Sequence, residues 1–231
     1  MAHQTLDSEN GIIIDVDVTA GNVPDNVPYL EQIGRSIDTL AEMNIKTEAV
    51  AADSSYDTAL IHKELDNRRI TVYMPKKESA DNLKAAFKKK DFTYNSETDT
   101  FTCPASETLT LRCLQRSEAG VFREYRADTK VCRYCTHHDK CLAPSQKSRR
   151  ILINIFHDIV EKHHESDGTP EYIAALNKRQ IWCEGTFSTQ KSQHNLKQLL
   201  RQGLKAAADH CFISASAINL KRLVKHKIQV T

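Results

Sequence analysis

Along the first third of the chain, segments in which hydrophobic residues recur at every second position alternate with segments in which they recur every three or four positions. Residues 11–19 alternate apolar and polar side chains after a short apolar run, which predicts a β-strand. Residues 28–43 repeat apolar side chains every three or four positions, which predicts an amphipathic helix. Similar patterns then predict a strand ending at Asp53, a helix over 55–69 and a strand over 70–77. This order of strands and helices is typical of βαβ units with a partly parallel sheet.

The alternation breaks after this region. Residues 79–90 predict a short charged helix, and residues 91–104 predict a β-hairpin around a polar turn. The stretch from Cys103 to Cys141 is rich in thiols and has no long apolar period, so we expect an insertion with its own small framework. Helical patterns then resume over three stretches, 147–165, 170–200 and 204–226.

Composition adds few constraints. The chain has 231 residues, 40% of them hydrophobic, which is enough for a sizeable core. No apolar run approaches the length of a membrane span, and the polar N-terminus lacks a signal-peptide core, so the sequence predicts a cytoplasmic protein. The net charge of +2 is small, but basic residues cluster in places. Such clusters fit either a nucleic-acid partner or solvated helix faces. They are the stretches 84–92, 145–150 and 218–227.

Asp53 is the first candidate for chemistry. It ends the apolar strand "AVAAD", and functional groups of open α/β sheets gather beyond the carboxyl ends of strands. A carboxylate there can bind a divalent metal ion through oxygen. It can equally cap the helix that starts near Tyr56, and both interpretations remain open.

Glu184 is the second candidate, on the predicted helix over 170–200. Lys191 follows seven residues later, two turns along the same face, whereas Arg179, five residues before Glu184, is one step off that face but still near. A carboxylate and cations on one face could bind a metal ion and a phosphate. An exposed helix with ordinary charge pairs has the same periodicity.

Five of the seven cysteines lie between residues 103 and 141. Cys132, Cys135 and Cys141 are spaced C-x2-C-x5-C, and the first two form a common half-site for tetrahedral zinc. Cys103 is the preferred fourth ligand. The alternatives are Cys113, His137 and His138. Unligated, reduced thiols are the competing interpretation.

Three segments together resemble DDE-type insertion-sequence transposases. They are "VTAGNVPDNVPYLEQI", "AADSSYDT" and "RQIWCEGTFSTQKSQHNLKQLLRQGL". The cysteine-rich stretch before the last segment resembles the branch of the family that carries such an insertion. The resemblance runs from about residue 5 to residue 225, and the order and spacing of the segments carry it.

The resemblance implies an α/β fold, a ribonuclease-H-like mixed sheet with flanking helices, interrupted by a small cysteine-rich insertion. It implies that Asp53 is the second metal-binding acid and Glu184 the third, with Mg²⁺ or Mn²⁺ as cofactor. Arg179 and Lys191 would contact DNA phosphate. DNA (transposon ends and target) and a second copy of the chain are the implied partners, in the bacterial cytoplasm at the nucleoid. We expect residues 1–98 and 147–231 to form the catalytic domain and residues 99–146 to form a zinc-binding insertion.

The first acid of the family lies on a strand upstream of the matched segments, and neither Asp7, Asp15 nor Asp17 aligns with it. We therefore expect the C-terminal portion of a transposase for DNA cleavage and strand transfer, truncated and inactive. Two alternatives remain. One is a non-catalytic, zinc-stabilised nucleic-acid-binding remnant, and the other is an unrelated α/β nuclease with its own metal site.

Overall fold

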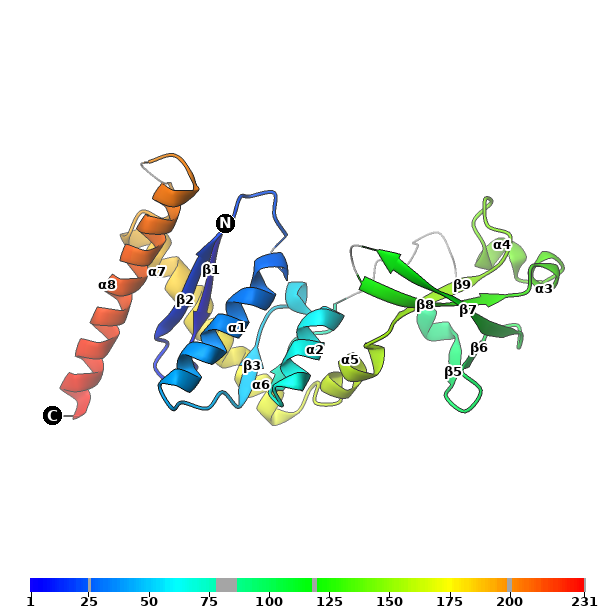
Figure 1. Ribbon diagram of the computed structural model, residues 1–231, viewed down its shortest axis with the longest axis horizontal. Helices are drawn as coiled ribbons and strands as arrows, with labels where there is room; N and C mark the ends of the chain where they lie inside the picture. Colours follow the sequence, from blue (N-terminus) through cyan, green and yellow to red (C-terminus); the bar gives the residue numbers. More distant parts are fainter. Residues whose placement is uncertain (25, 78–86, 118–119, 199–200, 231) are drawn as a thin grey trace. The chain divides into compact units, whose positions relative to one another are not determined.

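The structure is a computed structural model, drawn in Figure 1. It describes residues 1–24, 26–77, 87–117, 120–198 and 201–230. The chain forms two compact units. Unit 1 comprises Met1–Lys77 and Ile159–Thr231, and unit 2 comprises Glu78–Asp158. Most of the helix predicted over 79–90, and part of the basic cluster 84–92, lie outside the described residues.

Unit 1 contains two pairs of strands. The first pair is antiparallel, β1 (Ala2–Leu6) with β2 (Ile13–Val18). The second pair is parallel, β3 (Ala49–Ala51) with β4 (Thr71–Tyr73). The predicted strands over 11–19, 46–53 and 70–77 are therefore confirmed as shorter elements. Strand β1 was not predicted, because its segment is polar and gave no strand signal.

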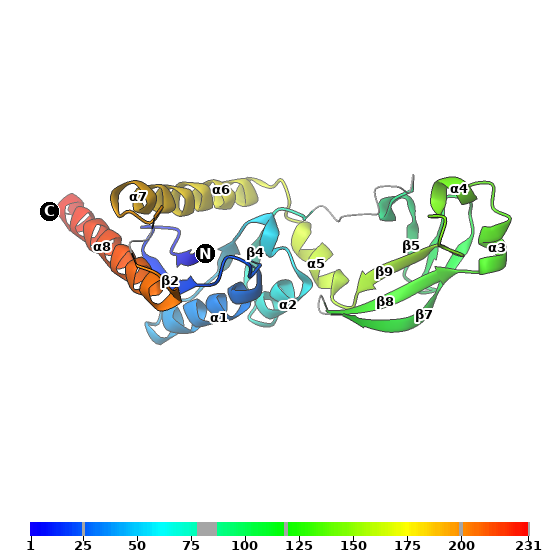
Figure 2. The same ribbon diagram turned by 90° about the horizontal axis from the view of Figure 1, so that it is seen from above.

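Helices lie on both sides of these strands (Figure 2). Helices α6 and α7 run along one side, and α1 and α2 lie on the other, while α8 packs against β2. The predicted helices over 28–43, 55–69 and 204–226 are confirmed. The bounds are α1 (Asn26–Glu42), α2 (Ala59–Asn67), α6 (Pro170–Arg179), α7 (Gly185–Gln193) and α8 (Leu204–Val230).

Two buried clusters hold unit 1 together. One joins α1 and α2 to β3 and β4, and Leu65 at its centre is fully buried. The other joins β2 to α8, where Ile13 and Val16 pack against the small side chains of Cys211 and Ala215. Cys211 is thus a core residue and packs as a small apolar side chain.

Unit 2 is built on a five-stranded antiparallel sheet in the order β5-β6-β7-β8-β9. Its strands are β5 (Thr93–Asn95), β6 (Thr100–Thr102), β7 (Thr108–Ser117), β8 (Gly120–Ala127) and β9 (Arg150–Asn154). Its short helices are η2 (Lys89–Asp91), α3 (Thr129–Arg133) and α4 (His138–Cys141). The predicted hairpin is confirmed as β5 and β6. The buried core includes Phe101, Leu109 and Tyr125.

The helix predicted over 147–165 is wrong in its first half. Residues 150–154 form β9, with Ile151 and Ile153 buried and Leu152 exposed. This alternation is typical of a strand that buries one face. Phe156 and the apolar residues after it extend the segment and gave it the spacing of a helix. The helix α5 begins only at His157 and ends at His164.

The chain is therefore a mixed α/β protein, as the alternating patterns predicted. The ribonuclease-H-like arrangement stays a prediction, since β1-β2 and β3-β4 are separate two-stranded sheets. Within the described residues, none of the helices combines the length and apolar character needed to cross a membrane.

Candidate functional site

Asp53 lies two residues after the end of strand β3 and caps a single 3₁₀ turn, η1 (Ser54–Tyr56). Its Oδ1 atom accepts a hydrogen bond from the backbone N–H of Ser54 at 2.6 Å. Helix α2 has a different N-cap, Thr58. The capping interpretation is therefore right for the 3₁₀ turn, but it occupies only one carboxylate oxygen. The second oxygen, Oδ2, takes no part in this cap and faces Nη2 of Arg179 at 3.3 Å.

Glu184 is the last residue of η3 (Gln180–Glu184), a turn of π-helix between α6 and α7. Hydrogen bonds in a π-helix run from residue i to residue i+5, so residues five apart lie nearly above one another. Arg179 is five residues before Glu184, and the π-turn therefore aligns the two side chains. π-Turns inside helices are found frequently at functional sites.

One guanidinium group brings the two candidate acids together. The Nη2 atom of Arg179 lies 3.3 Å from Oδ2 of Asp53, and its Nη1 atom lies 3.9 Å from Oε1 of Glu184. The Asp53 and Glu184 side chains are 53% and 60% exposed, whereas Arg179 is 24% exposed. The result is an open pair of carboxylates around a partly buried cation.

The helix that carries Glu184 is held by groups from both ends of the chain. Trp182 donates its indole N–H to the backbone oxygen of Ser8 at 3.0 Å. Arg222 of α8 lies over the Trp182 ring, 5.1 Å from its centroid, and donates to the backbone oxygen of Gly11. Burial lowers the pKa of Arg222, and burial raises the pKa of the neighbouring Cys183 thiol. These contacts fix the π-turn in place.

The other sequence candidates in unit 1 lie as follows. Lys191 is exposed on α7. Asp15 and Asp17 of β2 both bind Arg35, at 3.1 and 3.2 Å. The carboxylate of Asp7 accepts backbone N–H groups in the turn after β1.

The exposed oxygens of Asp53 and Glu184 fit a hard divalent ion such as Mg²⁺ or Mn²⁺, which prefers carboxylate ligands. The positively charged guanidinium of Arg179 lies between these two carboxylates. A divalent ion and this guanidinium would compete for the same two carboxylates. The donor set therefore fits such an ion once Arg179 has another anionic partner.

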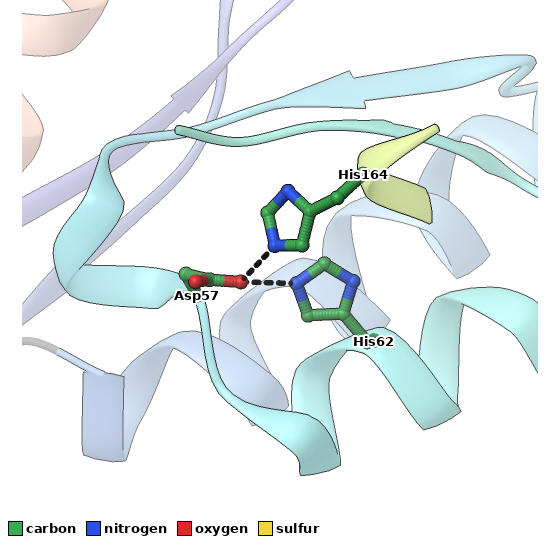
Figure 3. Close-up of side chains that lie close together, drawn as sticks. All are labelled: Asp57, His62 and His164. Atoms are coloured by element: carbon green, nitrogen blue, oxygen red, sulfur yellow. Dashed lines mark hydrogen bonds and ion pairs between the residues drawn. The ribbon is translucent and has the colours of Figure 1, made fainter. Parts of the chain in front are cut away.

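A second cluster in unit 1 brings three buried side chains to one point (Figure 3). His62 Nε2 lies 2.7 Å from Oδ1 of Asp57, and His164 Nε2 lies 3.0 Å from the same oxygen. Among the described residues, these three form the one group of His, Cys, Asp or Glu whose ligand atoms all lie within 4.8 Å of one another.

Each member of this cluster comes from a different element. Asp57 follows η1, His62 lies on α2, and His164 ends α5. Burial raises the pKa of Asp57, but hydrogen bonds from His62 and from the Lys77 backbone outweigh it, so the pKa lies below its usual value. The sequence did not predict this cluster, because the three positions share no local spacing. The pair of histidines before an acidic stretch, "KHHESD", was the one available signal.

The candidate zinc ligands lie in unit 2. Cys103, Cys132 and Cys141 pack against its core. Burial raises the pKa of the Cys132 and Cys141 thiols, and the nearby thiols raise it further. The Sγ atoms of Cys103 and Cys135 each accept a backbone N–H at 3.4 Å. The four thiols thus lie in one region, without the close grouping found at Asp57.

Comparison with known proteins identifies the family. A family model described as a transposase DDE domain matches residues 102–224, which is more than half of the chain. The chain therefore belongs to the transposase DDE domain family. No curated protein matches the chain, and no solved structure matches it. Proteins of this family generally use divalent metal ions, and membership implies DNA as the partner.

Proposed function

We propose that this chain supplies metal-binding and DNA-contacting groups for DNA cleavage and strand transfer during transposition of an insertion sequence. The observation that supports this function most directly is the contact of one guanidinium with both candidate acids. Arg179 lies 3.3 Å from Asp53 and 3.9 Å from Glu184, although the two acids belong to distant segments. Family membership gives the reaction class.

Asp53 and Glu184 would hold the divalent ion through their exposed oxygens, with Mg²⁺ or Mn²⁺ as the natural choice. Divalent ions held there would supply the activation of water or of a DNA 3′-hydroxyl and the stabilisation of the leaving oxygen. The backbone N–H of Ser54 keeps the Asp53 carboxylate oriented. The π-turn aligns Glu184 with Arg179, whose Nη1 atom lies 3.9 Å from Oε1 of Glu184.

Arg179 and Lys191 would contact phosphate. Arginine binds phosphate in a planar, often bidentate geometry, so a DNA phosphate is a good competing partner for the Arg179 guanidinium. When Arg179 turns to the phosphate, both carboxylates lose their internal cation and become free to bind metal. DNA and metal would then bind cooperatively. Transposition joins two DNA ends, which favours a homodimer as the working form.

Metal binding and DNA nicking together test this proposal. Electron paramagnetic resonance can follow the titration of the full chain with Mn²⁺. We expect Mn²⁺ to bind, and we expect the affinity of the protein for Mn²⁺ to fall about 10-fold or more in Asp53→Asn and in Glu184→Gln. Glu171→Gln is the matched control, since Glu171 is exposed at the start of the same helical segment. The proposal fails if both site variants bind Mn²⁺ as the control does.

The nicking assay measures the reaction itself, on supercoiled DNA with Mg²⁺ or Mn²⁺. The described residues bring two carboxylates to the site, which is a small ligand set for two ions. We therefore expect slow or absent nicking by the chain alone, and any nicking should disappear in Glu184→Gln. Rapid nicking that survives in this variant would exclude the assignment of Glu184.

A non-catalytic nucleic-acid-binding protein stabilised by zinc is the second candidate. The proximity of the thiols in unit 2 favours it, since Cys103, Cys132 and Cys141 pack against the same core. Burial and then the neighbouring thiols raise the pKa of Cys132 and of Cys141. Zinc would displace the thiol protons, link the ligands to one another and so stabilise the fold of residues 99–146. Elemental analysis should then find less zinc in Cys135→Ser than in Cys113→Ser, because Cys113 is an exposed residue of β7. Equal zinc content in the two variants would count against these ligands.

A further inference from the structure

The cluster around Asp57 has the burial expected of a built site. The side chains of His62, His164 and Asp57 are 1%, 4% and 6% exposed. Their ligand atoms converge from a loop and two helices, so the fold of unit 1 assembles them. One carboxylate oxygen and two imidazole nitrogens are a common ligand set for first-row transition metals.

Groups behind the cluster hold two of its members in orientation. Asp57 Oδ2 accepts the backbone N–H of Lys77 at 2.6 Å, which leaves Oδ1 for the two imidazoles. His164 Nδ1 lies 3.1 Å from Oδ2 of Asp167. A histidine that binds metal through one nitrogen usually donates the other N–H to a carboxylate or carbonyl, and His164 has this arrangement.

The third member is held in a similar way. His62 Nδ1 lies 2.8 Å from Nδ1 of His163, so one of the two rings donates and the other accepts. His163 Nε2 lies 3.7 Å from Oδ1 of Asp66. If Nε2 of His62 binds a metal ion, the Nδ1–H of His62 can donate to Nδ1 of His163. The proton of His163 is then on Nε2, which faces Asp66.

The protons at His164 provide an independent indication of a cation. Its Nε2 faces Asp57 Oδ1 and its Nδ1 faces the carboxylate of Asp167. A neutral imidazole has one N–H and can donate to only one of them. The other nitrogen would turn a lone pair toward a carboxylate. Either a second proton on the ring or a metal ion next to Nε2 removes this conflict.

We propose that Asp57, His62 and His164 bind a Zn²⁺ ion as its three protein ligands, with water in the fourth tetrahedral position. Tetrahedral zinc keeps its nitrogen and oxygen ligands about 3.3 Å apart. Nε2 of His62 and Nε2 of His164 lie 2.7 and 3.0 Å from Oδ1 of Asp57, so each would move about half an ångström or less away from that oxygen. Imidazole ligands favour zinc over Mg²⁺. This ion is therefore distinct from the hard ion proposed at Asp53 and Glu184.

The ion would stabilise the loop that positions Asp53. Asp57 lies four residues after Asp53, at the end of η1, and the ion would connect this loop to α2 and to the last turn of α5. Asp57 also holds Lys77, the last residue of the first segment of unit 1. Zinc bound here would thus reinforce the discontinuous unit where its two segments meet.

Cobalt substitution tests the site in the full chain. The protein is stripped with a chelator and titrated with Co²⁺, in a Cys132→Ser, Cys135→Ser background that removes two of the four candidate thiolate ligands of unit 2. We expect visible d–d bands of tetrahedral cobalt without a thiolate charge-transfer band. Asp57→Asn and His164→Gln should each weaken binding about 10-fold or more. His226→Ala is the control, since His226 is exposed on α8.

Equal cobalt affinity in His164→Gln and His226→Ala would overturn the proposal and leave a doubly protonated His164 as the explanation. Circular dichroism checks that each variant folds, and the isosteric Asp57→Asn decides the question if a histidine variant does not. Asp53→Asn and Glu184→Gln should retain this cobalt, which separates the site from the proposed DNA-cleavage site. Cobalt lost in those two variants and kept in His164→Gln would also overturn the assignment.

Discussion

The guanidinium of Arg179 lies 3.3 Å from the carboxylate of Asp53, and 126 positions of the chain separate the two residues. The same group lies 3.9 Å from the carboxylate of Glu184. An internal cation thus occupies the place between two exposed acids. Such a cation reduces the repulsion between the acids and competes with any metal ion that they bind.

Replacing this cation should strengthen metal binding. In Arg179→Gln, both carboxylates lose their counter-charge, so we expect the affinity for Mn²⁺ to rise several-fold and the affinity for DNA to fall. Calorimetric titration with Mn²⁺ measures the first effect. Lys178→Gln is the control, because Lys178 pairs with Glu9 at 2.9 Å instead. Weaker Mn²⁺ binding in Arg179→Gln would contradict the competition.

Lys191 should contribute to DNA binding through charge alone. Lys191→Ala is expected to weaken binding to DNA of any sequence and to reduce the slope of log K against log salt by about 1. Fluorescence anisotropy at several salt concentrations measures this slope. Lys46→Ala removes an exposed lysine from the loop between α1 and β3 and serves as the control. An unchanged slope in Lys191→Ala would exclude a phosphate contact.

Gly11 permits the close approach of Trp182. It has φ +69°, and a Cβ atom at this position would lie 2.6 Å from Cδ2 of Trp182. Gly11→Ala should therefore cost about 1–2 kcal/mol from the backbone and about 1–3 kcal/mol from overpacking.

Urea denaturation can follow this loss through fluorescence, since Trp182 is the single tryptophan. Gly21→Ala is the matched control, because a Cβ atom at Gly21 meets nothing within 4 Å. We also expect Gly11→Ala to weaken Mn²⁺ binding, since Trp182 is two residues before Glu184. Equal stability of the two alanine variants would show that the Trp182 ring moves without cost.

Asp99 stabilises unit 2 by accepting hydrogen bonds from Tyr125 at 2.6 Å and Tyr94 at 2.8 Å. Asn tolerates the positive φ of 50° at this position, so Asp99→Asn removes mainly the charge. The change should cost about 1–2 kcal/mol, since hydrogen bonds to charged groups are the stronger ones. Tyr94→Phe should cost less, because Tyr94 is exposed while Tyr125 is buried.

The hydrogen bonds from Tyr125 and Tyr94 to Asp99 also predict that the stability of unit 2 depends on pH. Hydrogen bonds from Tyr125 and then Tyr94 hold the pKa of Asp99 below its usual value. The unfolded chain therefore binds this proton at a higher pH, near 3.9. The stabilisation is complete above that pH and is lost as the pH falls through the folded pKa. The stability difference between wild type and Asp99→Asn should shrink over this acid range in urea titrations, and a constant difference would contradict it.

Periodic segments of the sequence predicted their elements well. The apolar stripe over 28–43 corresponds to α1, and the stripe over 204–226 corresponds to α8. Shorter patterns were ambiguous. The run "RRILINIF" fits a helix in isolation, and it becomes β9 because β8 offers a strand to pair with. Local propensity is a weak guide when tertiary pairing decides the conformation.

The geometry around the candidate residues Asp53, Arg179 and Glu184 could not be predicted from the sequence. Helical spacing placed Arg179 off the face of Glu184, because an α-helix repeats every 3.6 residues. The π-turn restores the alignment, and no local sequence signal predicts that turn. The cluster of Asp57, His62 and His164 depends on contacts across 107 positions, which a single sequence does not reveal.

The two segments of unit 1, Met1–Lys77 and Ile159–Thr231, impose an order on biosynthesis. Unit 2 leaves the ribosome whole, while the β-strands of unit 1 still lack α6, α7 and α8. At about 5–20 residues per second, that wait lasts on the order of ten seconds. During this time the nascent chain exposes apolar surface such as Ile13 and Val16, which α8 later covers. A chaperone that binds extended apolar segments would therefore act on this protein before its acidic pair exists.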